Sequence, residues 1–190
     1  MENKNYLEEL SILQKYIILL LGAGGNQPIK GNTHFQKEVF LLCKNFNEIS
    51  IEASFEPDMY GPYSEVADEQ LDELEMDDFV IREGQKAKLS NEGLEMYKLI
   101  IKTIDEERLE TIDGLKALLN DLTPPEILTL IYASFPEFTE ESWVKSDIDL
   151  NSQANAIKLY KKGKISLQKA AEISNIPISI FAEKVQNEAS

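Results

Sequence analysis

The segment Ser64–Leu89, with the sequence SEVADEQLDELEMDDFVIREGQKAKL, decides the fold that we expect for this chain. Ser64 is a favoured helix N-cap, and the residues after it predict a helix to about residue 76. Residues 79–82 and 86–89 predict two strands, because they are apolar or alternating and flank a three-residue turn that contains a glycine. The segment therefore predicts a helix followed directly by a β-hairpin.

Elements on both sides of this segment complete the predicted order. Apolar residues at helical spacing predict helices at 5–21 and 33–46, and an alternating pattern predicts a short strand at 51–55. After the hairpin, helices are expected at 90–113 and from Thr123 to a stop at Pro136. Helix, helix, helix and hairpin is the order of a winged-helix domain, so we expect a mainly α fold with one short hairpin.

Composition excludes several classes of protein. The chain has 190 residues, and its 34 acidic and 19 basic side chains give a formal net charge of −15. This charge excludes a uniformly basic nucleic-acid binder and a polybasic membrane-surface protein. The longest apolar run, Tyr16–Leu21, is far shorter than the roughly 20 residues that span a bilayer, and no signal peptide is clear. We expect a soluble, cytoplasmic protein.

The charge is distributed unevenly along the chain. Residues 151–190 contain six lysines and three glutamates, a net charge of +3, whereas residues 1–150 contain 13 basic and 31 acidic residues, a net charge of −18. The polar stretch Ser146–Gln153 lacks apolar periodicity and is expected to be the boundary. This asymmetry predicts two domains with different partners: an acidic winged-helix domain at 1–150 and a helix-turn-helix tail at 151–190.

The helix before the hairpin would read the major groove if the first domain bound DNA. It carries six acidic residues and no basic one, so its surface repels phosphate and argues against DNA binding by this domain. Two interpretations remain: an ordinary solvated acidic face, or a platform for a basic protein partner. The residues expected to bind such a partner are Glu65, Asp68, Glu69, Asp72 and Glu75.

Four segments carry a family resemblance in the first domain. They are Phe35–Leu42 (FQKEVFLL), Phe55 followed by Tyr60–Ser64 (YGPYS), the hairpin, and Leu89–Gly93 (LSNEG), and 131–136 and 138–142 extend the match. In this order they resemble a prokaryotic winged-helix family similar to the Panacea antitoxin domains, over about residues 10–145. The resemblance implies that the domain neutralises or regulates a protein, such as a toxin, and performs no enzymatic chemistry.

The tail has the requirements of a helix-turn-helix. Helices are expected at 154–162, 167–173 and 178–187, with Gly163 and Ser166 between the first two. Ala171 supplies the small residue where two helices cross, and Asn175 tolerates the left-handed turn between them. Apolar residues beyond the turn, Ile176, Phe181 and Val185, would fix the helix angle. The alternative is a generic helical hairpin packed on the main domain.

A second resemblance covers about residues 153–188. The sequences LYKKGKIS (159–166) and KAAE (169–172), with Phe181 beyond, resemble a small prokaryotic helix-turn-helix antitoxin family encoded beside PIN-domain toxins. Members usually carry a short extended segment in front, where this chain has an acidic winged helix. The resemblance implies DNA binding by the tail and a toxin as protein partner.

Roles follow for the polar residues of the tail if it binds DNA. Lysines would contact phosphate, and polar residues on the last helix would reach base edges. The predicted DNA-binding residues are Lys161, Lys162, Lys164, Lys169, Ser179, Lys184, Gln186 and Asn187. The last helix has no arginine, so one copy should bind weakly and a homodimer on a palindromic site would compensate. The alternative is that these lysines form an ordinary solvated face.

No pattern predicts catalysis, a metal site or a cofactor. Cys43 is expected in the core, His34 is expected to be structural or exposed, and Trp143 is expected to pack the two parts together. The main prediction is an antitoxin-like or transcriptional regulatory protein. The alternative is an acidic protein-interaction module or inhibitor, for example a DNA mimic, that does not bind DNA.

Overall fold

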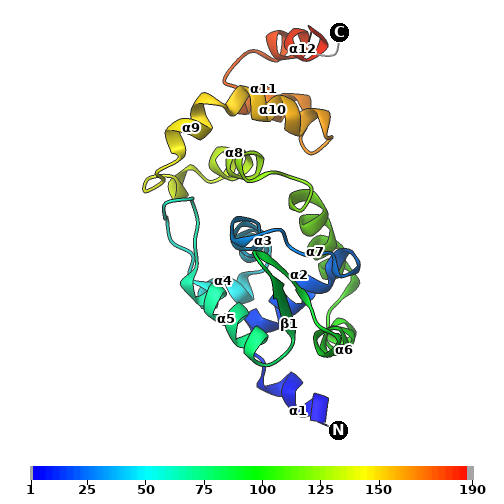
Figure 1. Ribbon diagram of the computed structural model, residues 1–190. Helices are drawn as coiled ribbons and strands as arrows, with labels where there is room; N and C mark the ends of the chain where they lie inside the picture. Colours follow the sequence, from blue (N-terminus) through cyan, green and yellow to red (C-terminus); the bar gives the residue numbers. More distant parts are fainter. Residues whose placement is uncertain (1, 188–190) are drawn as a thin grey trace. The chain divides into compact units, whose positions relative to one another are not determined.

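The computed structural model describes residues 2–187, with side chains described from Tyr6 onward. These residues form twelve α-helices, two 3-10 turns and one two-stranded antiparallel sheet (Figure 1). The fold is mainly α, as predicted, and the hairpin follows the helix α5. The chain divides into two compact units: unit 1 holds the residues up to Glu56 and Pro62–Asp121, and unit 2 holds Pro57–Gly61 and the residues from Leu122 onward.

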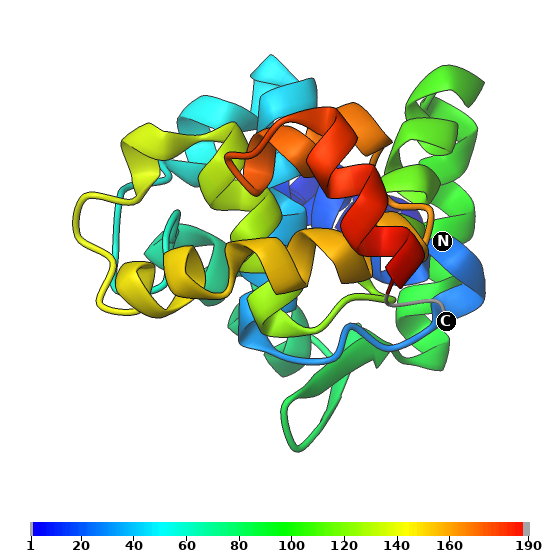
Figure 2. The ribbon, with the colours of Figure 1, turned by 90° about the horizontal axis from the view of Figure 1, so that it is seen from above.

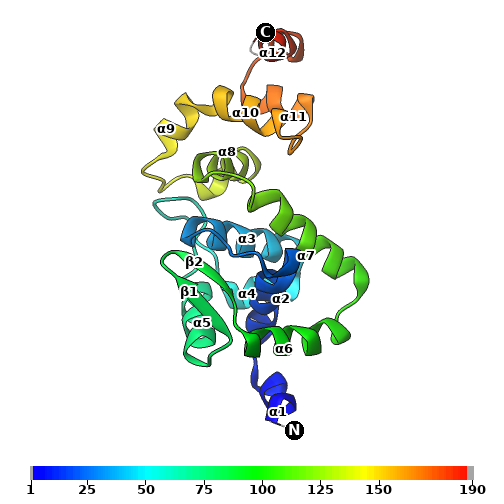
Figure 3. The ribbon, with the colours of Figure 1, turned by 45° about the vertical axis from the view of Figure 1, so that its right-hand side comes forward.

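Unit 1 contains the helices and the hairpin that were expected around residues 64–89. Its elements are α1 (Glu2–Glu9), α2 (Ile12–Asn26), α3 (Asn32–Asn45), α4 (Asn47–Ala53), α5 (Glu65–Met76), β1 (Val80–Glu83), β2 (Lys86–Leu89), α6 (Asn91–Ile100), η1 (Ile101–Thr103) and α7 (Glu106–Leu119). The side chains of α2 form the centre of this unit, because Leu13, Ile17 and Leu20 are completely buried. Around α2 pack α4, α5, α6, α7 and β2, as Figure 3 shows.

The hairpin is a small wing beside α5. Ser64 caps α5 by accepting a hydrogen bond from the Ala67 N–H at 2.9 Å, as predicted. Val80 pairs with Leu89 at one end of the antiparallel ladder, and Gly84 takes a positive φ of 65° in the turn. An isolated antiparallel bridge also joins Ile29, in the loop after α2, to Ala87 of β2.

The prediction of one continuous helix at 5–21 is wrong, because the helix is interrupted at residues 10–11. The structure has two helices there, because Ser11 starts α2 with a capping box: its hydroxyl accepts from the Gln14 N–H, and the Gln14 side chain accepts from the Ser11 N–H. A capping box satisfies two backbone donors at a helix start and so favours a break at this position.

The predicted strand 51–55 is also wrong, because this segment belongs to α4 and the turn after it. Ile49 and Ala53, four residues apart, are completely buried, whereas Ile51 between them is 91% exposed. The buried spacing is that of a helix, and Ser54 ends the helix with a left-handed φ of 45°.

The predicted helix 90–113 is divided in the structure into α6, η1 and the first part of α7. Ile104 is extended, and Asp105 caps α7 by accepting from the Arg108 N–H at 2.9 Å. An aspartate N-cap stabilises a new helix start, so the polar segment around residue 105 separates two helices.

Unit 2 is entirely helical apart from its loops. Its elements are α8 (Pro124–Ser134), η2 (Pro136–Phe138), α9 (Lys145–Leu150), α10 (Ser152–Lys161), α11 (Leu167–Ile173) and α12 (Ile178–Asn187). Ser146–Gln153, expected as a domain boundary, forms most of α9 and the start of α10, so residue 150 lies inside unit 2. In Figure 2, which looks from above, α12 lies nearest the viewer, in front of α10 and α11.

The three helices of the tail share a core of their own, and α10 and α11 also pack on α8. Their common core contains Ala156, Ala170 and Phe181. On the other side of α10, the buried Asn155 side chain donates to Thr129 Oγ1 of α8 at 2.9 Å. Every helix within residues 2–187 is too short or too polar to cross a membrane.

Candidate nucleic-acid interface and acidic helix

The connection between α11 and α12 has the predicted helix-turn-helix conformation. Ser166 caps α11 by accepting from the Lys169 N–H at 3.1 Å. At the other end, Asn175 has a positive φ of 50°, and the Ile176 N–H donates to the Ala171 carbonyl at 3.2 Å. This left-handed residue reverses the chain, so α12 starts in a new direction one residue after Pro177.

Phe181 holds α12 against the two preceding helices. Its side chain is completely buried, and its ring meets the Tyr160 ring edge-on, with 6.2 Å between centroids. Ala170 and Ala171 are buried beneath it and permit close approach because their side chains are small. Phe181 is the buried residue of α12, so most of this helix faces outward.

Four polar residues predicted to reach bases are exposed on α12: Ser179, Lys184, Gln186 and Asn187. The ammonium of Lys184 donates to Gln153 Oε1 at 2.9 Å, so it lies beside the first turn of α10. Two apolar residues, Ile178 and Ile180, are 49% and 42% exposed beside them. The outer face of α12 therefore mixes polar groups with isoleucines that could contact thymine methyl groups.

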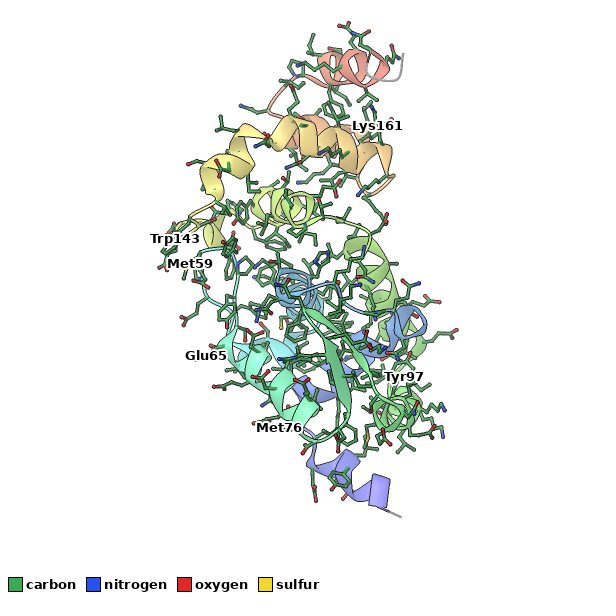
Figure 4. The ribbon with its side chains drawn as sticks, in the orientation of Figure 1. Met59, Glu65, Met76, Tyr97, Trp143 and Lys161 are labelled. Atoms are coloured by element: carbon green, nitrogen blue, oxygen red, sulfur yellow. The ribbon has the colours of Figure 1, made fainter. Side chains whose placement is uncertain are left out.

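Three of the predicted phosphate-binding lysines lie at the end of α10 and on α11. Lys161 is exposed at the last turn of α10 (Figure 4), and Lys164 is half-buried in the following loop. Lys169 is half-buried and lies 3.6 Å from a carboxylate oxygen of Glu172, one turn along α11. A solvent-accessible ion pair of this kind contributes little to stability and can exchange its partner for phosphate.

Lys162 has a structural partner that the sequence did not reveal. Its ammonium lies 2.8 Å from Oε2 of Glu126, whose side chain is only 2% exposed at the start of α8. The Thr123 N–H and hydroxyl also donate to this oxygen, at 2.7 and 2.9 Å. Burial alone would raise the pKa of Glu126, but these hydrogen bonds outweigh it and lower that pKa. Lys162 was predicted to contact phosphate, but in the structure its ammonium is engaged by Glu126 and joins α10 to α8.

The acidic residues of α5 are divided between local contacts and solvent. Arg82 of β1 forms ion pairs with Asp72 and, at 3.4 Å, with Glu75. Glu65 and Glu69 are exposed on the outer face, and Figure 4 shows Glu65 at the first turn of the helix. The predicted protein-binding face is therefore partly neutralised at its C-terminal end.

Asp68 was expected on the same protein-binding face, but it connects α5 to its neighbours. Its carboxylate accepts from the Gln36 side chain at 2.7 Å, the Tyr63 hydroxyl at 2.8 Å and the Asn32 side chain at 3.2 Å. These hydrogen bonds join α3 and the turn before α5 to the helix, so Asp68 stabilises unit 1.

Sequence reasoning missed two buried ionisable residues, Glu38 of α3 and Lys116 of α7. Glu38 is completely buried, and neither of its carboxylate oxygens has a hydrogen-bond partner among the described residues. Burial raises the pKa of Glu38 to about 8, although the nearby Lys116 and Lys30 oppose this rise. Lys116 donates to the Leu21 carbonyl at 2.6 Å, and burial lowers its pKa to about 8. The sequence did contain a signal for the buried lysine. Lys116 is at helical spacing from Ile112 and Leu119, which places a charge on the apolar face of the helix.

Three further residues were singled out by the sequence. Cys43 is buried in the core of unit 1, as predicted, and burial raises the pKa of its thiol to about 12. His34 is buried on α3. Trp143, which was expected to pack the two parts of the chain together, is 79% exposed, so that prediction is wrong.

Comparisons with known proteins add no family to these observations. No family model matches the chain, and neither a curated protein nor a solved structure matches it.

Proposed function

We propose that the protein is a DNA-binding regulator that uses α12 as its recognition helix. The observation that carries this proposal is the left-handed Asn175 between α11 and α12, together with the complete burial of Phe181. This geometry holds α12 on one buried side chain and leaves its polar face outward, as a helix entering the major groove requires. The proposal includes no catalytic chemistry.

Electrostatics favour the same part of the chain. Residues 151–190 have a net charge of +3 within a protein of net charge −15, so phosphate approaches this region most readily. Lys161 at the end of α10, Lys164 in the loop after it and Lys169 on α11 are the proposed phosphate contacts. Because α12 lacks an arginine, two copies on a palindromic site would give the affinity that one copy lacks.

A protein partner completes the proposed antitoxin-like role. Glu65 and Glu69 remain exposed on α5 after Arg82 has neutralised the other end of the helix, and they would attract a basic partner such as a toxin. Regulation of transcription would take place in the compartment that holds the DNA, so a cytoplasmic location belongs to this proposal.

The decisive experiment measures DNA affinity by fluorescence anisotropy across a salt series, on a duplex selected from random sequences with the full-length protein. The full chain is used because Asn155 and Thr129 join α10 to α8. Replacing Lys161 and Lys164 by glutamine should weaken binding to all sequences and reduce the salt slope by about 2. The control Lys102→Gln removes an exposed lysine from η1 in unit 1 and should leave the slope unchanged.

Base-reading residues should behave differently from these lysines. Ser179→Ala or Gln186→Ala should relax sequence preference, with each lost base contact costing about 1–3 kcal/mol. If no duplex binds the wild-type protein even at low salt, the DNA-binding proposal is wrong, and the acidic protein-interaction module becomes the better description.

A further inference from the structure

An exposed aromatic surface lies on unit 2, away from the helix-turn-helix. Met59, Tyr60 and Trp143 form it and are called the Trp143 patch below; they are 39%, 53% and 79% exposed. The backbone N–H of Trp143 donates to the Met59 carbonyl at 3.1 Å, which joins two segments that are distant in the sequence. Figure 4 shows Trp143 and Met59 side by side.

The backbone under the Trp143 patch is held firmly. The Ser142 hydroxyl contacts the Met59 carbonyl at 3.2 Å and the Tyr132 hydroxyl at 2.6 Å. Gly61 has a positive φ of 80°, and a Cβ at this position would lie 2.7 Å from a carbon of the buried Tyr132 ring. The loop can therefore approach α8 closely only with glycine at residue 61, and the three exposed side chains are presented on a fixed base.

Exposure of these side chains has a thermodynamic cost that an interface would recover. A large aromatic side chain that stays in water forgoes the favourable free energy of burying its apolar surface. Tryptophan, tyrosine and methionine are the residues enriched at the centres of protein interfaces, and tryptophan and tyrosine dominate their binding energy. A rigidly held group of all three types is thus typical of a docking site for another protein.

The charge around the Trp143 patch selects the kind of partner. Residues 57–61 and 136–150 together contain six acidic side chains and a single lysine, Lys145. That lysine is paired with Asp149 at 3.0 Å, while Glu140 and Glu141 are exposed three and two residues before Trp143. Such a surface repels nucleic acid and acidic proteins and attracts arginine or lysine side chains.

We propose that the Trp143 patch binds a basic protein segment that carries arginine or lysine next to an apolar side chain. The cation would lie over the Trp143 or Tyr60 ring, within reach of Glu140 and Glu141, and the apolar side chain would cover Met59. This site consists of different residues from the DNA-binding face proposed for α12 and from the exposed glutamates of α5.

Trp143 is the single tryptophan of the chain, so intrinsic tryptophan fluorescence reports on this site alone. The probe is a synthetic peptide of alternating arginine and leucine, and the control peptide carries glutamate in place of arginine. The basic peptide should shift the Trp143 emission to shorter wavelength in a saturable manner. Added salt should weaken the binding of this peptide. The acidic peptide should produce no shift. Absence of a shift with the basic peptide would overturn the proposal.

Charge-reversal variants separate this site from general attraction to an acidic protein. Glu140→Lys with Glu141→Lys should weaken peptide binding at least about tenfold, because both substitutions lie beside the proposed cation. Glu8→Lys with Glu9→Lys changes the net charge equally at two exposed positions of α1 and should alter affinity less than about twofold. Equal losses in the two variants would contradict a specific site.

A labelled peptide extends the test to a variant that lacks the reporter. Trp143→Ala should weaken binding of the labelled basic peptide at least about tenfold by anisotropy, as truncation of an interface hot spot does. The same variant should keep the DNA affinity of the wild type, which separates failure of this site from failure of the DNA-binding proposal. If the Trp143 emission shifts with protein concentration without peptide, the occupant is a second copy of the chain and the proposed partner is wrong.

Discussion

The ammonium of Lys162, at the end of α10, lies 2.8 Å from Oε2 of Glu126, a buried carboxylate at the start of α8. This ion pair connects the helix-turn-helix to the rest of unit 2. Lys161, the preceding residue, is exposed. Lys162 therefore anchors the tail, a role that the sequence did not predict because it gives both adjacent lysines the same signal.

Removal of the anchoring lysine should destabilise the protein. Lys162→Met leaves Glu126 buried with fewer donors, so the free energy of unfolding should fall by about 1–3 kcal/mol. Because the pKa of Glu126 is lowered in the folded state, its contribution is present above the ordinary carboxyl pKa and is lost as pH falls. The free energies of unfolding of the wild type and Lys162→Met, measured with urea, should therefore become equal at acidic pH. The control Lys158→Met, at an exposed position of α10, should cost less than about 1 kcal/mol, and an equal loss in both variants would contradict this account.

The buried Glu38 should give the protein a characteristic pH dependence. Its folded pKa is raised from 4.5 to about 8, so its contribution to stability is full below about pH 4.5 and is lost as pH rises toward 8. Glu38→Gln should remove this decline, and by pH 8 it should be more stable than wild type by at least about 1 kcal/mol. Urea unfolding across this pH range tests it. The exposed control Glu110→Gln should keep the wild-type slope, and an unchanged slope in Glu38→Gln would disprove the prediction.

The left-handed turn at Asn175 can be tested through its backbone. Asn175→Val places a β-branched residue at a φ of 50° and should cost about 1–2 kcal/mol, because the left-handed region penalises such side chains. Asn175→Gly should stay within about 1 kcal/mol of wild type, since glycine adopts this conformation freely. Thermal unfolding gives the comparison. Equal stability of the two variants would show that the turn is not left-handed in solution.

Two helical glycines of unit 1 should respond to alanine in opposite directions. A Cβ at Gly93 would lie 2.0 Å from the Phe79 carbonyl oxygen, so Gly93→Ala should destabilise by about 1–3 kcal/mol or more. A Cβ at Gly114, on the exposed face of α7, meets nothing within 4 Å. Gly114→Ala should stabilise by about 0.5–1 kcal/mol, because alanine is the better helix former. Chemical unfolding of both variants tests the pair, and the same sign in both would refute the packing of α6 on Phe79.

Local signals in the sequence predicted much of the fold correctly. Ser64 and Ser166 cap the helices that follow them, Gly84 makes the hairpin turn, and Asn175 makes the left-handed turn. Each of these features depends on one residue and its immediate neighbours, so the sequence contains the necessary information. The helix breaks at Ser11 and Asp105 were missed although their caps are also local, because the apolar spacing continues across both positions.

The segment 51–55 was predicted wrongly because its alternating pattern is short. Five residues fit a strand and a helix equally well until it is known which of them are buried. Ile49 and Ala53 face the core and Ile51 faces solvent, and this choice depends on the helices that pack against α4.

The sequence by itself determined the helical content, the wing and the turn that orients α12, since caps, glycines and apolar spacing act over a few residues. Only the tertiary structure decided which charged and aromatic side chains are buried. It brought Lys162 to Glu126, enclosed Glu38 beside Lys116 and left Trp143 in solvent. The physical reason is that burial and pairing depend on residues far apart in the chain, whose approach no local pattern encodes.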